Sequence, residues 1–165
     1  MIVSVLILGL VTVQRLSELV VARRNTRALL ANGGVERGAS HYPLMVALHA
    51  TWLAGLWWLG WDRPANLAWV GVYAVLEILR LWVLLSIGRR WTTRIIVVPG
   101  ETLVRKGPYR FIPHPNYAVV AAEIAVLPLV FGLVEFAVVF SVLNAAMLWL
   151  RIRAEGAALI DARAT

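Results

Sequence analysis

The sequence of 165 residues contains no cysteine. Disulfides, thiolate zinc sites, iron–sulfur clusters and a cysteine nucleophile are therefore excluded. Any chemistry must use oxygen and nitrogen groups, and we expect no metal site. The chain also lacks a Gly-x-Gly-x-x-Gly motif after a strand and shows no alternation of strand and helix patterns, which excludes a soluble Rossmann-type fold. A basic leader and a small-residue cleavage signal are absent too, so we interpret the N-terminus as a retained membrane span.

Acidic residues are scarce and apolar residues are abundant. The chain has nine Asp and Glu and sixteen Lys and Arg, which give a formal net charge of +7. Of its residues, 61% are hydrophobic. The mean hydropathy is +0.76, and soluble domains are only roughly 45 to 50% apolar. The composition predicts an all-α integral membrane protein with a single domain over residues 1–165. Membrane topology explains the positive charge, so we expect no nucleic-acid partner.

Five apolar runs predict a bundle of five transmembrane helices, the last two of which divide one run of 35 residues at Gly132. Between the third and fourth runs lies a polar segment. Within it, 95–98 and 102–104 flank Pro99-Gly100 and suggest a short β-hairpin in a cytoplasmic loop. The tail after residue 150 is predicted to continue as an amphipathic helix. The predicted spans are residues 1–21, 43–61, 66–87, 116–132 and 134–150.

The basic residues predict the topology. Five spans place alternate loops on opposite sides, and thirteen basic residues fall in the first loop, the third loop and the tail, whereas only Arg63 falls in the loops of the other side. The positive-inside rule therefore predicts an outside N-terminus and a cytoplasmic tail. The thirteen residues are Arg23, Arg24, Arg27, Arg37, Arg89, Arg90, Arg94, Arg105, Lys106, Arg110, Arg151, Arg153 and Arg163.

Polar groups occur inside four of the predicted spans, where each is costly unless paired or hydrated. Glu77 and Arg80 are three residues apart and are expected to neutralise each other. Glu123, Asn144 and His49 are expected at a similar depth in the cytoplasmic half. We interpret this layer as a cavity open to the cytoplasm and to lipid. Interhelical hydrogen bonding is the alternative for Asn144 or His49 taken singly.

The first span carries a polar stripe of its own. Arg15, Glu18, Ala22 and Asn25 follow a 3, 4, 3 spacing and share one helical face. Because the stripe is expected near the membrane surface, we interpret it as snorkelling of long side chains rather than as a functional group.

A polar stretch, GPYRFIPHPNY at 107–117, lies between apolar runs. Its prolines forbid a regular helix and predict a rigid loop at the start of the fourth span. Free backbone N–H groups at that helix start favour an anion or a carboxylate. At the other end of the same helical hairpin, Arg151 and Glu155 in RIRAEGAAL lie one helical turn apart on one face. The hairpin is therefore expected to bring two polar patches together, although interfacial charges are an alternative.

These motifs resemble those of the isoprenylcysteine carboxyl methyltransferase family of integral membrane enzymes. The resemblance covers about residues 86–160 and depends on GPYRF, HPNY and RIRAE. In the N-terminal half, QRLSELVVARRN and HYPLMVALH resemble the bacterial branch of the family, which includes members found with polyketide enzymes that make long-chain phenols and pyrones. The resemblance implies a bacterial inner membrane as the location.

The resemblance implies S-adenosylmethionine as the methyl donor, bound in a cytoplasm-facing pocket formed by the loop, the hairpin and the tail. Arg151 and Glu155 would meet the carboxylate and the ammonium of its methionine end. Two positions depart from the family pattern, which has a basic residue where Pro113 stands and often a polar residue where Gly156 stands. The residues carried over as donor-binding are Tyr109, Arg110, His114, Pro115, Tyr117, Arg151 and Glu155.

The acceptor is expected to be lipophilic and to reach the site from the membrane. Methyl transfer is an in-line displacement that gains from alignment and from the absence of water. Arg80 would hold a carboxylate acceptor, whereas Glu123 or His114 would act as the base for a phenol or enol acceptor, the case we favour slightly.

Three further residues are candidates for binding the acceptor, and two other functions are alternatives to this methyl transfer. His49, Glu77 and Asn144 are the candidate acceptor-binding residues. One rival is N-methylation of a phospholipid amine. The other is a small transporter or lipid-binding bundle that uses Glu77 and Arg80 as its polar site.

Overall fold

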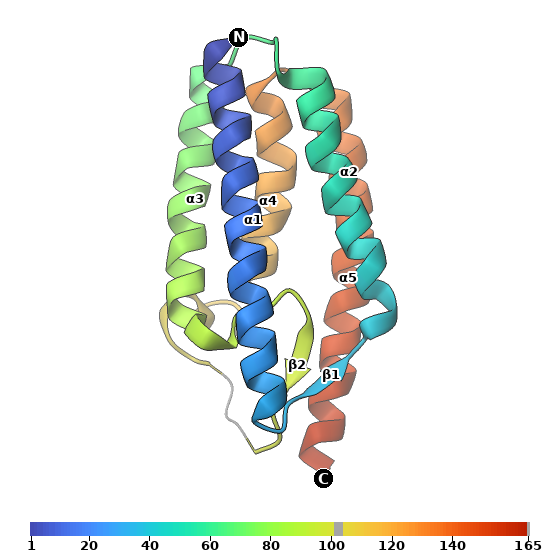
Figure 1. Cartoon of the computed structure of the whole chain (residues 1–165). Helices are drawn as coiled ribbons and strands as arrows, with labels where there is room; N and C mark the ends of the chain where they lie inside the picture. Colours follow the sequence, from blue (N-terminus) through green and yellow to red (C-terminus); the bar gives the residue numbers. More distant parts are fainter. Residues whose placement is uncertain (101–103, 165) are drawn as a thin grey trace.

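The computed structural model describes residues 1–100 and 104–164, which form five helices and a two-stranded sheet at one end of the bundle (Figure 1). All five predicted apolar runs are helical. The helices are α1 (Ile2–Ala31), α2 (Tyr42–Gly60), α3 (Leu67–Ile87), α4 (Pro115–Val130) and α5 (Val134–Ala164). The strands are β1 (Val35–Arg37) and β2 (Ile95–Val97), and the short 3-10 helices are η1 (Ala39–His41), η2 (Gly88–Arg90) and η3 (Gly107–Arg110).

Three of the helices are long and apolar enough to cross a membrane: α1, α3 with the turn that follows it, and α5. α2 has 19 residues and α4 has 16. That these two also cross, which would make five spans, stays a prediction. The predicted division of the long C-terminal run is confirmed, because a turn at Gly132, with φ of +68°, separates α4 from α5. The tail continues α5 without interruption through Gly156.

Local chemistry explains where the helices begin. The side chain of Asn66 caps α3 by accepting hydrogen bonds from the backbone N–H groups of Ala68, at 3.0 Å, and Trp69, at 3.3 Å. Pro115 stands at the first position of α4, where its fixed φ suits the helix and its missing N–H costs nothing.

The sheet differs from the predicted hairpin. The strand expected at 95–98 is confirmed as β2, but it pairs antiparallel with β1 of the first loop, with Val35 opposite Val97. Residues 102 and 103 of the other expected strand lie outside the described residues. The pairing arises because α1 continues to Ala31, ten residues past its predicted span, and carries the first loop to the level of the third.

The bundle has a filled core and an apolar outer surface. α3 packs along α4 and α4 packs along α5, while α2 makes fewer close contacts with its neighbours α1 and α5. Leu8, Trp52, Leu56, Ile124 and Leu127 are among the buried residues that connect the helices. Many large apolar side chains point outward, as expected for helices that face lipid.

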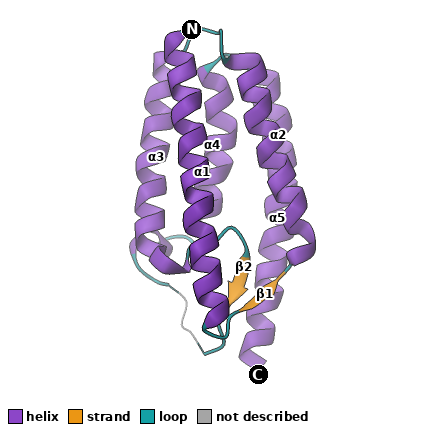
Figure 2. Ribbon diagram, viewed as in Figure 1, coloured by secondary structure: helices purple, strands orange, loops and turns teal. Residues whose placement is uncertain are grey.

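Both strands and the long loop after α3 lie at the same end as the C-terminus, opposite the N-terminus (Figure 2). The side chain of Asn25 on α1 donates a hydrogen bond of 2.8 Å to the carbonyl of Trp91 and so ties this loop to the bundle. The polar loops that the sequence assigned to one side of the membrane are thus gathered at one end of the molecule.

Candidate active site at the loop end of the bundle

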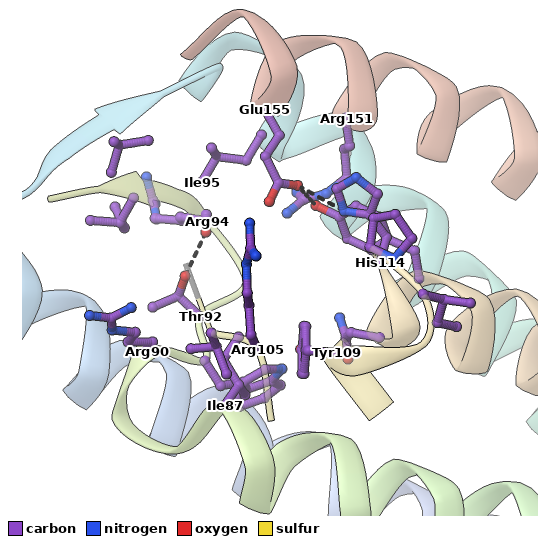
Figure 3. Close-up of a pocket in the computed structure, with 18 of the residues that line it drawn as sticks. Ile87, Arg90, Thr92, Arg94, Ile95, Arg105, Tyr109, His114, Arg151 and Glu155 are labelled. Atoms are coloured by element: carbon purple, nitrogen blue, oxygen red, sulfur yellow. Dashed lines mark hydrogen bonds and ion pairs between the residues drawn. The ribbon is translucent and has the colours of Figure 1, made fainter. Parts of the chain in front are cut away.

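A cavity of about 780 Å³ lies at the loop end, between the loop after α3, the start of α4 and the tail part of α5 (Figure 3). Its volume is in the range of roughly 300 to 1,000 Å³ that is usual for sites of small molecules. Six of the seven predicted donor-binding residues line it. These six are Tyr109, Arg110, His114, Tyr117, Arg151 and Glu155. The seventh, Pro115, is buried as the first residue of α4.

The proline-rich loop and the tail meet at Glu155. The hydroxyl of Tyr117 donates a hydrogen bond of 2.8 Å to Oε2 of Glu155, and Nδ1 of His114 lies 3.6 Å from the same oxygen. The rings of His114 and Tyr117 are stacked, with centroids 5.2 Å apart and an interplanar angle of 13°. Both contacts use one carboxylate oxygen, and the other, Oε1, accepts no hydrogen bond from any described residue. The predicted convergence of the two motifs is therefore confirmed.

Arg151 is a buried cation without an anionic partner in the part of the chain that the structure describes. It is only 5% exposed although it lines the cavity. Its Nη1 donates to Sδ of Met45 at 2.9 Å, a weak acceptor, and its guanidinium carbon lies 5.7 Å from the centroid of the Tyr117 ring. Within the described residues no carboxylate lies within ion-pair distance of it. A buried guanidinium is costly in this state, and an anion in the cavity would relieve the cost.

Cations dominate the cavity wall. Figure 3 shows the side chain of Arg105 extending across the cavity toward the side where Glu155 and His114 lie. Arg94 is held by Glu36, with Nη1 and Oε1 2.6 Å apart. The described lining residues include five arginines and one carboxylate: Arg90, Arg94, Arg105, Arg110, Arg151 and Glu155.

Two further polar side chains face the same space. Burial, with the nearby Glu155 carboxylate as a second cause, raises the pKa of Tyr109 from 10.0 to about 12. Oδ1 of Asn116 is buried and has no hydrogen-bond partner among the described residues. Sequence reasoning missed Asn116 and Arg105. The position of Asn116 between Pro115 and Tyr117 was the available signal.

Gly107 allows the loop to approach α3. Its φ is +57°, and a Cβ at this position would lie 2.0 Å from Oγ of Ser86. Only glycine provides both the left-handed backbone and the space, so Gly107 sets the position of Tyr109 and of the loop that follows it.

A second polar cluster lies deeper in the bundle and joins α1, α3 and α4. Arg80 donates to Oε1 and Oε2 of Glu18, both at 2.5 Å, and to Oε2 of Glu123 at 2.8 Å. Arg15 donates to the same Glu123 oxygen at 2.7 Å and to Glu18 at 3.4 Å. We name these four residues the ion-pair cluster.

The ion-pair cluster corrects two predictions. The predicted pair of Glu77 and Arg80 is wrong: Arg80 turns to Glu18 and Glu123, and Oε2 of Glu77 instead accepts from the amide of Gln14 at 2.6 Å. The interpretation of the α1 stripe as snorkelling is also wrong, since Arg15 and Glu18 are only 18% and 12% exposed. The spacing of residues along each helix identified which side chains share a helical face. It did not identify their ion-pair partners, which lie on other helices.

The five candidate residues expected in one cavity do not line the one described above: Glu77, Arg80, Glu123, His49 and Asn144. His49 forms a hydrogen bond of 2.9 Å between its Nδ1 and the carbonyl of Met45. Asn144 is 1% exposed, and its Oδ1 has no partner among the described residues. Arg80 and Glu123 are each seven residues from cavity-lining positions of their helices, which is about 10 Å along a helix axis.

Comparison with known proteins agrees with this geometry. The sequence profile of the isoprenylcysteine carboxyl methyltransferase (ICMT) family matches residues 69–161, which include the loop, α4 and the tail that form the cavity. The chain is also 41% identical over 159 residues to the uncharacterized protein YpbQ of Bacillus subtilis (strain 168), covering 93% of this chain and 95% of that protein. The chain belongs to the ICMT family.

Family membership confirms the resemblance found in the loop and tail motifs. An ICMT protein with three helices able to cross a membrane is an integral membrane protein, and the family is one of methyltransferases. No solved structure matches the chain.

Proposed function

We propose that this ICMT protein transfers a methyl group from S-adenosylmethionine to a lipophilic acceptor at the boundary between membrane and cytoplasm. The observation that carries the proposal is the presence of Arg151 and Glu155 on the wall of one cavity, where the buried Arg151 has no ion-pair partner among the described residues. The methionine end of the donor is a zwitterion, whose carboxylate and ammonium each favour an opposite charge. Arg151 and Oε1 of Glu155, which accepts no hydrogen bond from the described residues, offer those two charges one helical turn apart.

The remaining groups fit the rest of the donor. The stacked rings of His114 and Tyr117 present a flat aromatic surface, which suits either an adenine ring or a sulfonium cation. The unpartnered Oδ1 of Asn116 can accept a hydrogen bond from an amine or a hydroxyl. Pro113 and Gly156, which depart from the family pattern, are compatible with this cavity. The loop that contains Pro113 lines it, and α5 continues as a helix through Gly156.

When bound, the donor supplies an electrophilic methyl group on a sulfonium. The role of the chain is then to align donor and acceptor and to exclude water, which are the main sources of rate for such a displacement. Glu155 and Arg151 would fix the donor at the tail side of the cavity.

The excess of arginines supports a cytoplasmic location for this end of the molecule. Clusters of basic residues are retained on the cytoplasmic side of membrane proteins, where a soluble donor is also available. We therefore propose a bacterial inner-membrane protein with its N-terminus outside and with both the cavity and the tail in the cytoplasm. Its partners would be membrane lipid and one lipophilic substrate.

The test is transfer of a radiolabelled methyl group from the donor to a lipid extract, with the purified protein in detergent. Label in the organic phase is the expected result, and its alkali lability identifies the acceptor: a methyl ester releases methanol in base, whereas an ether or a methylated amine does not. Mass spectrometry then separates the ether from the amine. Donor binding without transfer to any lipid fraction would contradict the proposal.

A further inference from the structure

His49 on α2 has a fixed tautomer. Its Nδ1 lies 2.9 Å from the carbonyl oxygen of Met45. A carbonyl oxygen can only accept a hydrogen bond, so Nδ1 must carry the proton, and the Nε2 atom of the neutral ring then has a lone pair. Among the described residues no hydrogen bond to Nε2 is found. The imidazole therefore presents an unused basic nitrogen.

The position of His49 links the donor cavity to the deeper ion-pair cluster. Met45, one helical turn before it on α2, contacts Arg151 of the cavity through its sulfur, at 2.9 Å. The imidazole also lies within electrostatic range of Arg15 and Arg80 of the cluster and of Arg151.

Glu123, the base expected from the sequence, is poorly available for this role. Its Oε2 accepts from Arg15 at 2.7 Å and from Arg80 at 2.8 Å, and its side chain is fully buried. Both guanidinium groups would have to be displaced before this oxygen could take a proton, and no part of the side chain is exposed to an acceptor. His114 lies beside Glu155 in the predicted donor site. His49, one helical turn from the residue that contacts Arg151, has a basic nitrogen with no hydrogen-bond partner among the described residues.

We propose that His49 is the general base for methylation of a lipophilic hydroxyl acceptor, a phenol or an enol; this inference rests on the proposed function. The acceptor oxygen forms a bond to the methyl carbon while the carbon–sulfur bond of the donor breaks. The sulfur keeps the electron pair as the thioether of S-adenosylhomocysteine. The hydroxyl proton moves to Nε2 of His49, and the resulting imidazolium returns it to water at the cytoplasmic end.

The inference also selects the acceptor class. A carboxylate arrives ionised and needs no base, whereas a phenol ionises only near pH 10 and gains from one at neutral pH. A free imidazole nitrogen beside the donor cavity would have no use in ester formation from a carboxylate.

The first test is independent of activity. The chain contains three histidines, and ¹⁵N NMR of histidine-labelled protein in micelles distinguishes protonated from unprotonated ring nitrogens, with His49→Gln providing the assignment. We expect Nδ1 of His49 to be protonated and Nε2 to be unprotonated at neutral pH. A protonated Nε2 would overturn the inference.

The second test compares two long-chain alkylphenols, one of ordinary acidity and one made acidic by a ring nitro group, at a pH where only the second is ionised. His49→Gln should slow methylation of the ordinary phenol by about 10²- to 10⁴-fold and the ionised phenol far less. Binding of S-adenosylhomocysteine should be unchanged. His41→Gln, which removes a histidine outside the cavity wall, is the matched control and should keep both rates.

Each other outcome is decisive. Equal rate losses on both phenols, or none, would show that His49 does not take the proton. If S-adenosylhomocysteine binds but neither phenol is methylated, the hydroxyl acceptor is wrong while the proposed function stands. If S-adenosylhomocysteine does not bind, the proposed function itself fails.

Discussion

Glu18 of α1 and Arg80 of α3 form a two-point ion pair inside the bundle, with Nε to Oε1 and Nη2 to Oε2 both at 2.5 Å. Such parallel hydrogen bonds are among the stronger polar contacts in proteins. The remaining contacts of Arg80 and those of Arg15 converge on Glu123 of α4. The ion-pair cluster therefore fixes α1 against the α3–α4 pair just below the cavity at the loop end.

The ion-pair cluster predicts a large loss of stability when one partner is removed. Arg80→Met would leave two buried carboxylates with only Arg15 as a counter-charge, and breaking a buried pair in this way typically costs 3–5 kcal/mol. Equilibrium unfolding in mixed micelles measures the change. Arg94→Met is the matched control, because its ion pair with Glu36 is partly exposed (36% and 23%) and such pairs contribute about 0–1 kcal/mol. Equal losses for the two variants would contradict the account.

Tyr117→Phe isolates one contact of the candidate active site. The substitution keeps the ring that stacks on His114 and removes the hydroxyl that donates to Glu155. Without this bond Glu155 is less well oriented, and we expect the affinity for S-adenosylhomocysteine to fall by up to about tenfold, which corresponds to roughly 1.4 kcal/mol. Calorimetric titration measures it. An affinity equal to that of the wild type would mean that the hydroxyl does not orient the carboxylate.

Gly107→Ala should displace the proline-rich loop. The new methyl group would lie 2.0 Å from Oγ of Ser86 at a φ of +57°, and overpacking of this kind costs about 1–3 kcal/mol. Gly132→Ala separates the two causes, because its φ is +68° but no atom lies within 4 Å of the added Cβ. The Gly107 variant should lose more stability and should also lose S-adenosylhomocysteine binding, measured by thermal unfolding and calorimetry. Equal effects would assign the loss to backbone strain alone.

Tyr109 should give the protein a distinct alkaline titration. Burial, then the Glu155 carboxylate, raises its pKa to about 12 in the folded state. Because the folded pKa lies above the unfolded value of about 10, the stability linked to this proton is fully present below pH 10 and is lost as the pH rises through 12. The ultraviolet difference titration of wild type minus Tyr109→Phe should have its midpoint near 12. A midpoint near 10 would contradict the burial of this phenol.

The sequence predicts the helices and the convergence of the loop and tail motifs well, because these depend on local signals. Apolar runs, the Asn66 cap and Pro115 mark the helices, and the hairpin at Gly132 forces the loop and tail motifs together. The partners of side chains were less predictable. The predicted pairing of Glu77 with Arg80 satisfied the rule for residues three apart, yet burial against α1 and α4 offered Arg80 two better-placed carboxylates.

The strand pairing failed for a related reason. The sequence of β2 indicated a strand, but a partner from the first loop became available only because α1 extends to Ala31. The position of the first loop in the folded chain decided which strand pairs with β2. The local sequence of β2 does not contain this information.

Calorimetric titration of S-adenosylhomocysteine into the detergent-solubilised protein and two glutamate variants tests the donor site directly. A donor site in this cavity predicts saturable binding to the wild type. The affinity should be at least about tenfold lower for Glu155→Gln, which removes the charge that would meet the ammonium, and unchanged for Glu135→Gln in the first turn of the same helix. Absence of binding to the wild type, or equal affinities of the wild type and Glu155→Gln, would contradict the assignment of this cavity to the methyl donor.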